Sequence, residues 1–143
     1  MSGKGTKAYT TPRAFGGFQI PISLQSAAIR RYCEERGLAF HLHANENLIP
    51  HTYLVLESVV ADAATYEGIA MCSIDMLPTD SPHRRDLVRR CLAAGCCLHF
   101  LFEQRVVATA ADADELETLI GLGTVARTDV ARRAELSALA RLI

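Results

Sequence analysis

Residues that can transfer protons or bind hydroxyl and phosphate groups recur in four short segments, each directly after an apolar or mixed run. The segments are residues 10–13, 43–47, 73–75 and 102–104. Carboxylates and imidazoles in such positions can act as general acids or bases. An arginine can hold a phosphate or carboxylate with two hydrogen bonds. The four segments therefore predict one site for a small polar molecule.

Three residues are the candidates for proton transfer. Glu46 follows a predicted strand, where a carboxylate is either a general base or a solvated loop acid, and both interpretations stay open. His99 stands four residues before Glu103 in an apolar run, so that both side chains are expected on one face of a strand. His99 is then either a core residue with a polar partner or an acid/base group beside Glu103 or Glu46.

The candidates for binding substrate hydroxyl or phosphate groups come from the same regions: Tyr9, Arg13, Asn45, Ser73 and Asp75. No Gly-x-Ser-x-Gly pattern surrounds Ser73, which argues against a hydrolase nucleophile. No Gly-x-Gly-x-x-Gly or phosphate-loop pattern is present, so we expect no nucleotide cofactor. His41 and His43 share one face of a predicted strand, but no third ligand is evident, so we also expect no metal. The role of these two histidines stays open.

The elements that must position these residues alternate along the chain. Strands are predicted at residues 7–11, 38–44, 68–73 and 96–102, with a short edge strand at 105–109, and helices at 23–36, 51–66, 81–94 and 112–122. This alternation predicts an α/β fold: a three-layer arrangement with a mostly parallel four- or five-stranded sheet flanked by helices. Such sheets bind ligands at the carboxyl ends of their strands, where the four polar segments lie.

Composition and charge limit the class of protein. The chain has 143 residues and a formal net charge of -1, so it lacks the basic excess of a dedicated nucleic-acid binder. No apolar run approaches the ~20 residues that cross a bilayer, and residues 1–7 lack the apolar stretch of a signal peptide. We therefore expect a cytoplasmic protein with no nucleic-acid partner and no membrane contact. The five cysteines form no Cys-x-x-Cys pair, as expected for free thiols in a reducing compartment.

The domain organisation predicted from these patterns has three parts. Residues 1–7 form a flexible arm, residues 8–124 an α/β domain, and residues 125–143 a C-terminal helix. The last helix carries apolar residues that need a partner surface, which predicts a homo-oligomer that uses it.

Residues 23–37 resemble the first helix of serine recombinase (resolvase) catalytic domains, and residues 74–77 are similar to their Asp-Arg-Leu segment. The resemblance implies a resolvase/flavodoxin-like fold. It does not imply recombination, because Met76 stands where the family has an arginine and residues 78–80 lack the next one. Arg13 follows Tyr9 outside a clear Tyr-x-Arg-x-Ser pattern, and no basic DNA-binding extension is present.

A second resemblance covers roughly residues 8–107. Tyr9 and residues 13–17, 20–25, 29–33, 45–46, 73–78 and 98–103 resemble the pattern of the family described as sporadic carbohydrate cluster proteins. This resemblance implies a carbohydrate pathway and supplies no reaction. Its pattern includes the polar residues at the predicted strand ends but not His41 or His43.

Three hypotheses for function follow. The leading one is a cofactor-independent enzyme of sugar or aminoglycoside-type antibiotic biosynthesis, an epimerase, isomerase or aldol-type lyase, which moves a proton next to the carbonyl of a small-molecule sugar. The second is a non-catalytic sugar-binding or accessory protein of the same pathway. The third is a degenerate recombinase-like nucleic-acid module. The sequence leaves the sugar, the reaction and the oligomeric state undetermined.

Overall fold

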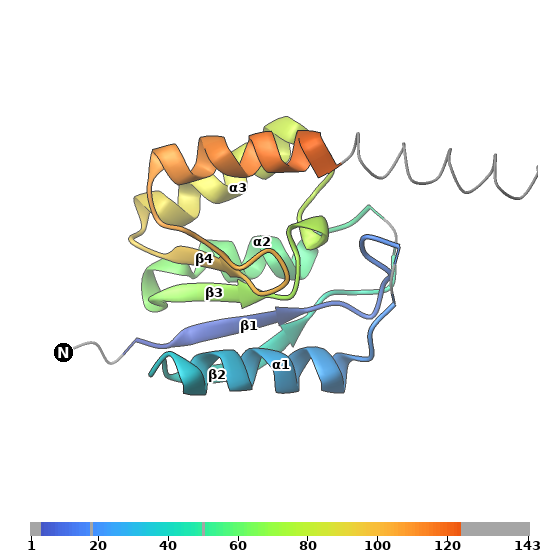
Figure 1. The fold of residues 1–143 in the computed structure, drawn as a ribbon, viewed down its shortest axis with the longest axis vertical. Coiled ribbons are helices and arrows are strands. Elements are labelled where there is room, and N and C mark those ends of the chain that lie inside the picture. Colours follow the sequence, from blue (N-terminus) through green and yellow to red (C-terminus); the bar gives the residue numbers. More distant parts are fainter. Residues whose placement is uncertain (1–3, 18, 50, 124–143) are drawn as a thin grey trace, which may run out of the picture. The chain divides into compact units, whose positions relative to one another are not determined.

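Five strands form one sheet whose first four members run parallel (Figure 1). The computed structural model describes residues 4–17, 19–49 and 51–123. The strands are β1 (Thr6–Thr10), β2 (Phe40–Asn45), β3 (Gly68–Met71), β4 (Cys97–Phe100) and β5 (Arg105–Val107), in the spatial order β2-β1-β3-β4-β5. Only β5 is antiparallel to its neighbour. The predicted α/β fold with a mostly parallel sheet is confirmed.

Burial explains the apolar sequence at the centre of this sheet. Every residue of β3 is buried, as expected for a strand covered on both faces, and its sequence is accordingly apolar without alternation. Ala8 of β1 and Ala70 of β3 lie side by side in the register. Both pack against Ile29 and Cys33 of helix α1 (Ile22–Glu35). Small alanines in the strands let this helix approach the sheet closely.

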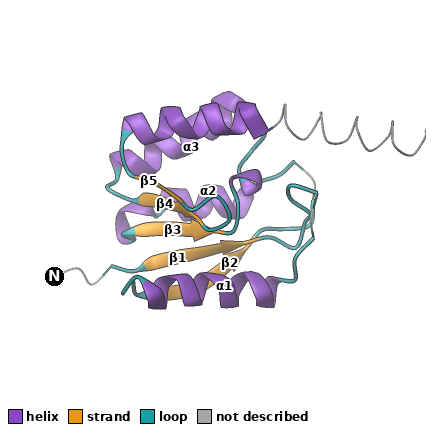
Figure 2. Ribbon diagram, viewed as in Figure 1, coloured by secondary structure: helices purple, strands orange, loops and turns teal. Residues whose placement is uncertain are grey.

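Two further helices connect the parallel strands (Figure 2). Helix α2 (Leu54–Ala61) is followed by a short 3-10 turn, η1 (Ala63–Thr65), and helix α3 (Ser81–Ala93) comes after a second turn, η2 (Ile74–Met76). Helices α2 and α3 contact each other. Glu57 of α2 and Arg90 of α3 form an ion pair of 2.7 Å. Gly95, with φ 76°, ends the α3 region in the left-handed conformation that glycine adopts most easily.

Several predicted boundaries need correction. Helix α1 begins at Ile22, directly after Pro21, one residue before its predicted start at residue 23. The cap of α3 is Asp80, whose carboxylate accepts from the His83 N–H. Strand β4 ends at Phe100, so Glu103 lies in the following turn and does not share a strand face with His99.

The chain divides by its contacts into residues Met1–Ala113 and Asp114–Ile143. Residues 110–123 are helical, in agreement with the helix predicted at 112–122. The predicted C-terminal helix at 125–143 lies outside the described residues, as do residues 1–3 of the predicted arm, so the three-part organisation stays a prediction. Among the helices of residues 4–123, positions 18 and 50 aside, none has the length and apolar character that a bilayer crossing needs.

Candidate functional site

The parallel strands bring all four predicted polar segments to one edge of the sheet, because β1, β2, β3 and β4 end on the same side. The strands that precede Glu46 and Glu103 are not neighbours in the sheet. β1 and β3 lie between β2 and β4, so the segments that hold Glu46 and Glu103 are three strand spacings apart, roughly 14 Å. Among the described residues these two carboxylates have separate partners and do not contact each other. Their catalytic roles stay predictions.

Glu46 is buried, with 3% of its surface exposed, and both of its carboxylate oxygens are hydrogen-bonded. Oε1 accepts from the Tyr9 hydroxyl at 2.8 Å and from the Leu56 N–H at 3.1 Å. Oε2 accepts from the N–H groups of Asn47 and Val55 at 3.1 and 3.2 Å. Val55 and Leu56 belong to the first turn of α2, where N–H groups lack partners within the helix. Glu46 thus caps α2 from another part of the chain.

Tyr9 and its neighbours support the same arrangement. Tyr9 is fully buried, and burial, together with the charge of Glu46, raises the pKa of its hydroxyl. Thr10, also fully buried, donates to the side chain of Asn45. Two residues predicted to bind substrate, Tyr9 and Asn45, therefore have partners within the protein.

Glu103 also accepts hydrogen bonds from within the protein, in the segment after β4. Its Oε2 accepts from the Ser73 hydroxyl at 2.8 Å and its Oε1 from the Ile74 N–H at 3.1 Å. Ser73 in turn accepts from the Asp75 N–H at 3.1 Å. These bonds fix the turn η2 to the segment after β4.

Replacement of Glu103 by alanine is expected to lower the free energy of unfolding by about 2 kcal/mol, because a buried hydroxyl and an N–H group lose their acceptor. Ser73→Ala and the double variant complete a mutant cycle. A coupling energy of about 1 kcal/mol between Ser73 and Glu103, measured by chemical denaturation, is expected for directly bonded side chains. Strictly additive effects would contradict the contact.

His99 lies away from both carboxylates. Its Nδ1 is 2.6 Å from the Tyr32 hydroxyl of α1, and its Nε2 is 3.3 Å from the Cys97 Sγ. The Cys97 thiol donates to the carbonyl oxygen of Glu67. In one arrangement the Tyr32 O–H donates to Nδ1 and the Nε2–H points at the Cys97 sulfur. A neutral imidazole then satisfies the hydrogen-bonding groups of Tyr32, His99 and Cys97. Burial, and secondarily the charge of Arg36, lower the pKa of His99 to about 4.

Arg13 is partly exposed in the loop after β1. Its guanidinium lies over the ring of Tyr53, 5.0 Å from the centroid, and donates to the carbonyl oxygen of Ile49 at 2.9 Å. A second N–H, at Nε, donates to Thr11 at 3.4 Å. The sequence correctly placed Arg13 at the carboxyl edge but did not predict its aromatic partner.

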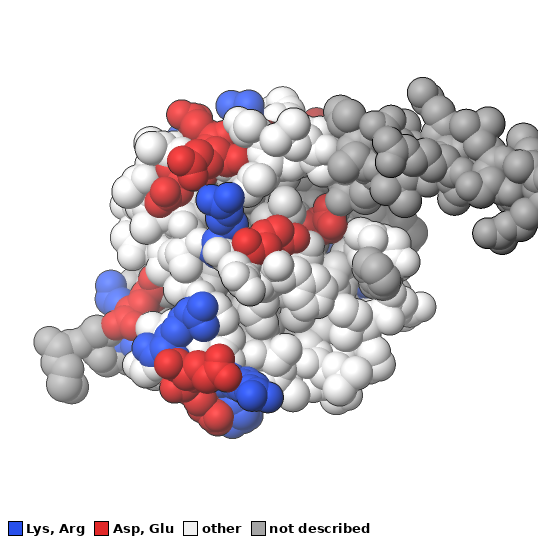
Figure 3. All heavy atoms as spheres, in the orientation of Figure 1, with Lys and Arg blue, Asp and Glu red and all other residues white. Residues whose placement is uncertain are grey.

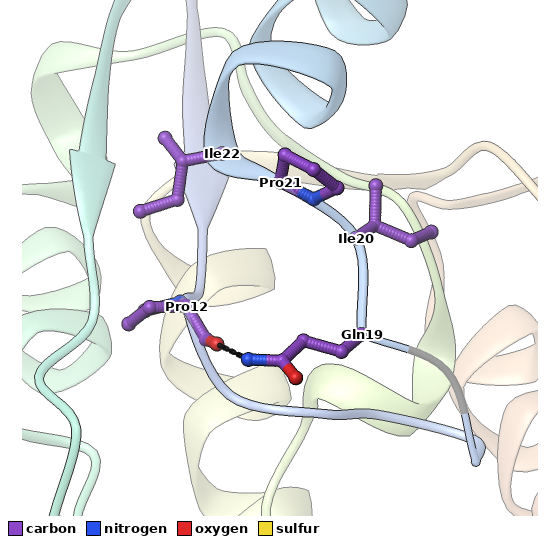
Figure 4. A pocket seen from close by; sticks show the side chains of 5 residues that line it. All are labelled: Pro12, Gln19, Ile20, Pro21 and Ile22. Atoms are coloured by element: carbon purple, nitrogen blue, oxygen red, sulfur yellow. Dashed lines mark hydrogen bonds between the residues drawn. The ribbon is translucent and has the colours of Figure 1, made fainter.

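A pocket of about 460 Å³ opens beside this loop (Figure 4). Its lining residues are Pro12, Gln19, Ile20, Pro21 and Ile22, none of which is among the residues predicted to bind substrate or to transfer protons. The strand order β2-β1-β3 places the end of β1 at a switch point of the sheet, where α/β proteins bind ligands. The loop after β3 comes near as well, because a Cβ on Gly16 would lie 2.5 Å from an Asp75 carboxylate oxygen. The pocket itself is formed by the loop between β1 and α1, at the carboxyl edge of the sheet.

His41 and His43 have different neighbours. The ring of His41 contacts Tyr66 edge-on, with centroids 5.7 Å apart, while His43 Nδ1 is 3.1 Å from the Ser26 hydroxyl. No group of three or more His, Cys, Asp or Glu within the described part of the chain is placed to hold a metal ion. The role of the two histidines stays open.

These features define an α/β protein with a five-stranded, mostly parallel sheet and polar residues after the carboxyl ends of its strands. No family model and no curated protein matches the chain. It is similar to the N-terminal catalytic domain of TP901-1 integrase, with a TM-score of 0.65 and 16% identity over 87% of this chain and 98% of that one. It is also similar to a resolvase family site-specific recombinase from Streptococcus pneumoniae, with a TM-score of 0.59 and 7% identity over 95% and 97% of the two chains. At these identities the likeness shows a resolvase-like fold.

These neighbours correct two predictions. The prediction of a carbohydrate-processing isomerase or epimerase in sugar or aminoglycoside antibiotic biosynthesis is wrong, because the similar structures are an integrase domain and a recombinase. The exclusion of nucleic acid as a partner is wrong for the same reason. It relied on net charge, which sums over the whole surface and does not report one local contact. Membership of the carbohydrate cluster family stays a prediction.

Proposed function

We propose that this chain is a resolvase-fold module that binds nucleic acid and does not cleave it. The observation that carries the proposal is the similarity over 98% of an integrase catalytic domain. The proposed scaffold is the three-layer arrangement expected from the sequence, with helices on both faces of the sheet. A cytoplasmic location belongs to the same proposal.

The hydroxyl groups near the ends of β1 and β3 are not placed for strand cleavage. Strand cleavage by a serine-type mechanism needs an accessible nucleophile. Thr10 and Thr11 are buried, with 0% and 3% of their surfaces exposed, and Ser73 is bonded to Glu103 with 2% exposed. The Tyr9 hydroxyl donates to a buried carboxylate, and its raised pKa disfavours the phenolate. None of these four hydroxyls is available to attack a phosphodiester.

Charge distribution indicates how nucleic acid would be bound. On the face shown in Figure 3, acidic and basic side chains of the described residues lie beside one another, without a continuous basic stripe. A long duplex contact needs many phosphate-binding cations. A contact with one or a few phosphates, at Arg13, agrees better with this mixed distribution of charge than a long duplex contact does. The described bonds of Arg13 to Thr11 and Ile49 use two of the five guanidinium N–H groups, and the others can meet a phosphate.

The test is binding of the full chain to a fluorescein-labelled oligonucleotide, followed by anisotropy at several salt concentrations. Arg13→Gln is expected to weaken binding roughly tenfold and to reduce the salt slope by about 1, as for one lost phosphate contact. Arg31→Gln is the matched control, because Arg31 is exposed on α1 and pairs with Glu35. It is expected to leave the affinity unchanged. A denaturing gel is expected to show intact strands.

Failure of the full chain to bind any single- or double-stranded oligonucleotide at low salt would overturn the proposal. Covalent attachment or cleavage of the strand would contradict its second half.

A further inference from the structure

The pocket beside β1 combines apolar walls with one side-chain amide. Pro12, Ile20, Pro21 and Ile22 supply the apolar surface, and the Gln19 side chain forms the remaining wall (Figure 4). None of the described residues that line it is charged. Its volume of about 460 Å³ is within the usual range of roughly 300–1,000 Å³ for small-molecule sites. Such a pocket suits a flat, uncharged group with polar edges.

The walls are held in place before a ligand binds. Gln25 is fully buried, and its amide bonds to both backbone groups of Thr11, accepting at 3.1 Å and donating at 2.6 Å. The same amide donates to the Ile20 carbonyl at 2.8 Å. The backbone next to Pro12 and the Ile20 wall are thus held by one buried side chain. A preformed site loses little conformational entropy on binding.

The exposed amide of Gln19 supplies the polar edge. One of its N–H groups donates to the Pro12 carbonyl at 3.2 Å (Figure 4). Among the described residues, this bond leaves the second N–H and the amide oxygen for a ligand. A glutamine amide matches adenine, since it accepts from the N6 amino group and donates to N7. Guanine presents acceptors at both corresponding positions, so it would leave the glutamine oxygen facing an acceptor.

Arg13 follows Pro12 directly in the chain and stacks on Tyr53 rather than entering the pocket lining. A nucleotide whose base occupies the pocket has its phosphate outside, near this part of the loop. The base must also be unpaired and outside the helical stack, because stacking in a duplex hides the faces that the apolar walls would cover.

We propose that the pocket of Pro12, Gln19, Ile20, Pro21 and Ile22 binds an unpaired adenine of a single strand, with Gln19 recognising the base and Arg13 holding the neighbouring phosphate. This inference rests on the proposed binding of nucleic acid and adds a substrate class to it.

The test uses the full chain and labelled eight-nucleotide thymidine strands that carry one central adenine, guanine or abasic position. The adenine strand is expected to bind about tenfold more tightly than the other two. Gln19→Leu is expected to make adenine and guanine equal. Gln19→Arg is expected to reverse the preference towards guanine, because arginine pairs with the guanine O6 and N7. Arg13→Gln is expected to weaken binding of all three strands by the same factor.

The outcomes separate this inference from the function on which it rests. Strands that bind with equal affinity, whatever the central base, would overturn the adenine site and leave nucleic-acid binding intact. Absence of binding to every strand would overturn both. Competition by a proline-rich peptide, together with no base preference, would assign the pocket to a peptide and also overturn the inference.

Discussion

Replacement of Glu46 by alanine is expected to lower the free energy of unfolding by about 4 kcal/mol. The substitution leaves the buried Tyr9 hydroxyl and the N–H groups of Val55 and Leu56 without their acceptor. Each buried donor without an acceptor costs about 1–3 kcal/mol. The favourable interaction of a carboxylate with the positive end of α2 is lost as well. A small domain has about 5–15 kcal/mol in total, so the variant is expected to be only marginally folded.

Urea denaturation followed by far-ultraviolet circular dichroism measures the effect. Glu46→Gln keeps one acceptor oxygen and places an amide nitrogen against donors, and its expected cost is about 2 kcal/mol. This milder variant keeps the prediction testable if Glu46→Ala does not fold. Glu35→Ala removes a carboxylate of the exposed pair with Arg31 and is expected to cost less than about 0.5 kcal/mol. Equal stabilities of the Glu46 and Glu35 variants would contradict the capping role.

Acidification from pH 7 to pH 4 is expected to remove about 3 kcal/mol of stability through His99 alone. The pKa of His99 is lowered from 6.5 to about 4 in the folded protein. Above pH 6.5 the imidazole is neutral in both states and has no effect. As the pH falls below 6.5, the unfolded chain binds a proton that the folded chain does not, so stability decreases until about pH 4. Each unit of difference in pKa corresponds to 1.36 kcal/mol.

The measurement compares the pH dependence of unfolding in the wild type and in His99→Gln. The variant lacks the imidazole but keeps the acidic groups that also titrate in this range, so the difference between the two curves belongs to His99. Tyr32→Phe removes the hydroxyl beside His99 Nδ1 and leaves the His99 imidazole buried. It is expected to keep most of the pH dependence, because burial is the main cause of the shift. Parallel curves for wild type and His99→Gln would contradict a buried neutral histidine.

The sequence by itself determined the order and type of the elements. Apolar runs at residues 68–73 and 96–102 predicted the central strands, and glycines at 37 and 95 marked the ends of two helices. Local periodicity and local turn chemistry suffice for this, because they act over a few neighbouring residues. The same reasoning predicted that four polar segments share the carboxyl edge, since strand direction follows from the alternation of strands and helices.

Only the tertiary structure decided what those polar residues do. The sequence left Glu46 as either a general base or a solvated loop acid, whereas the structure buries it against Tyr9, 37 positions away, and the first turn of α2. His99 was expected to be either a core residue with a polar partner or an acid/base group beside Glu103 or Glu46. The strand ends at Phe100, and the buried imidazole contacts Tyr32, 67 positions away, as in the first alternative. A sequence pattern shows which groups need partners. Which groups they meet depends on strand order and helix packing, because buried hydrogen bonds form between segments that only the folded chain brings together.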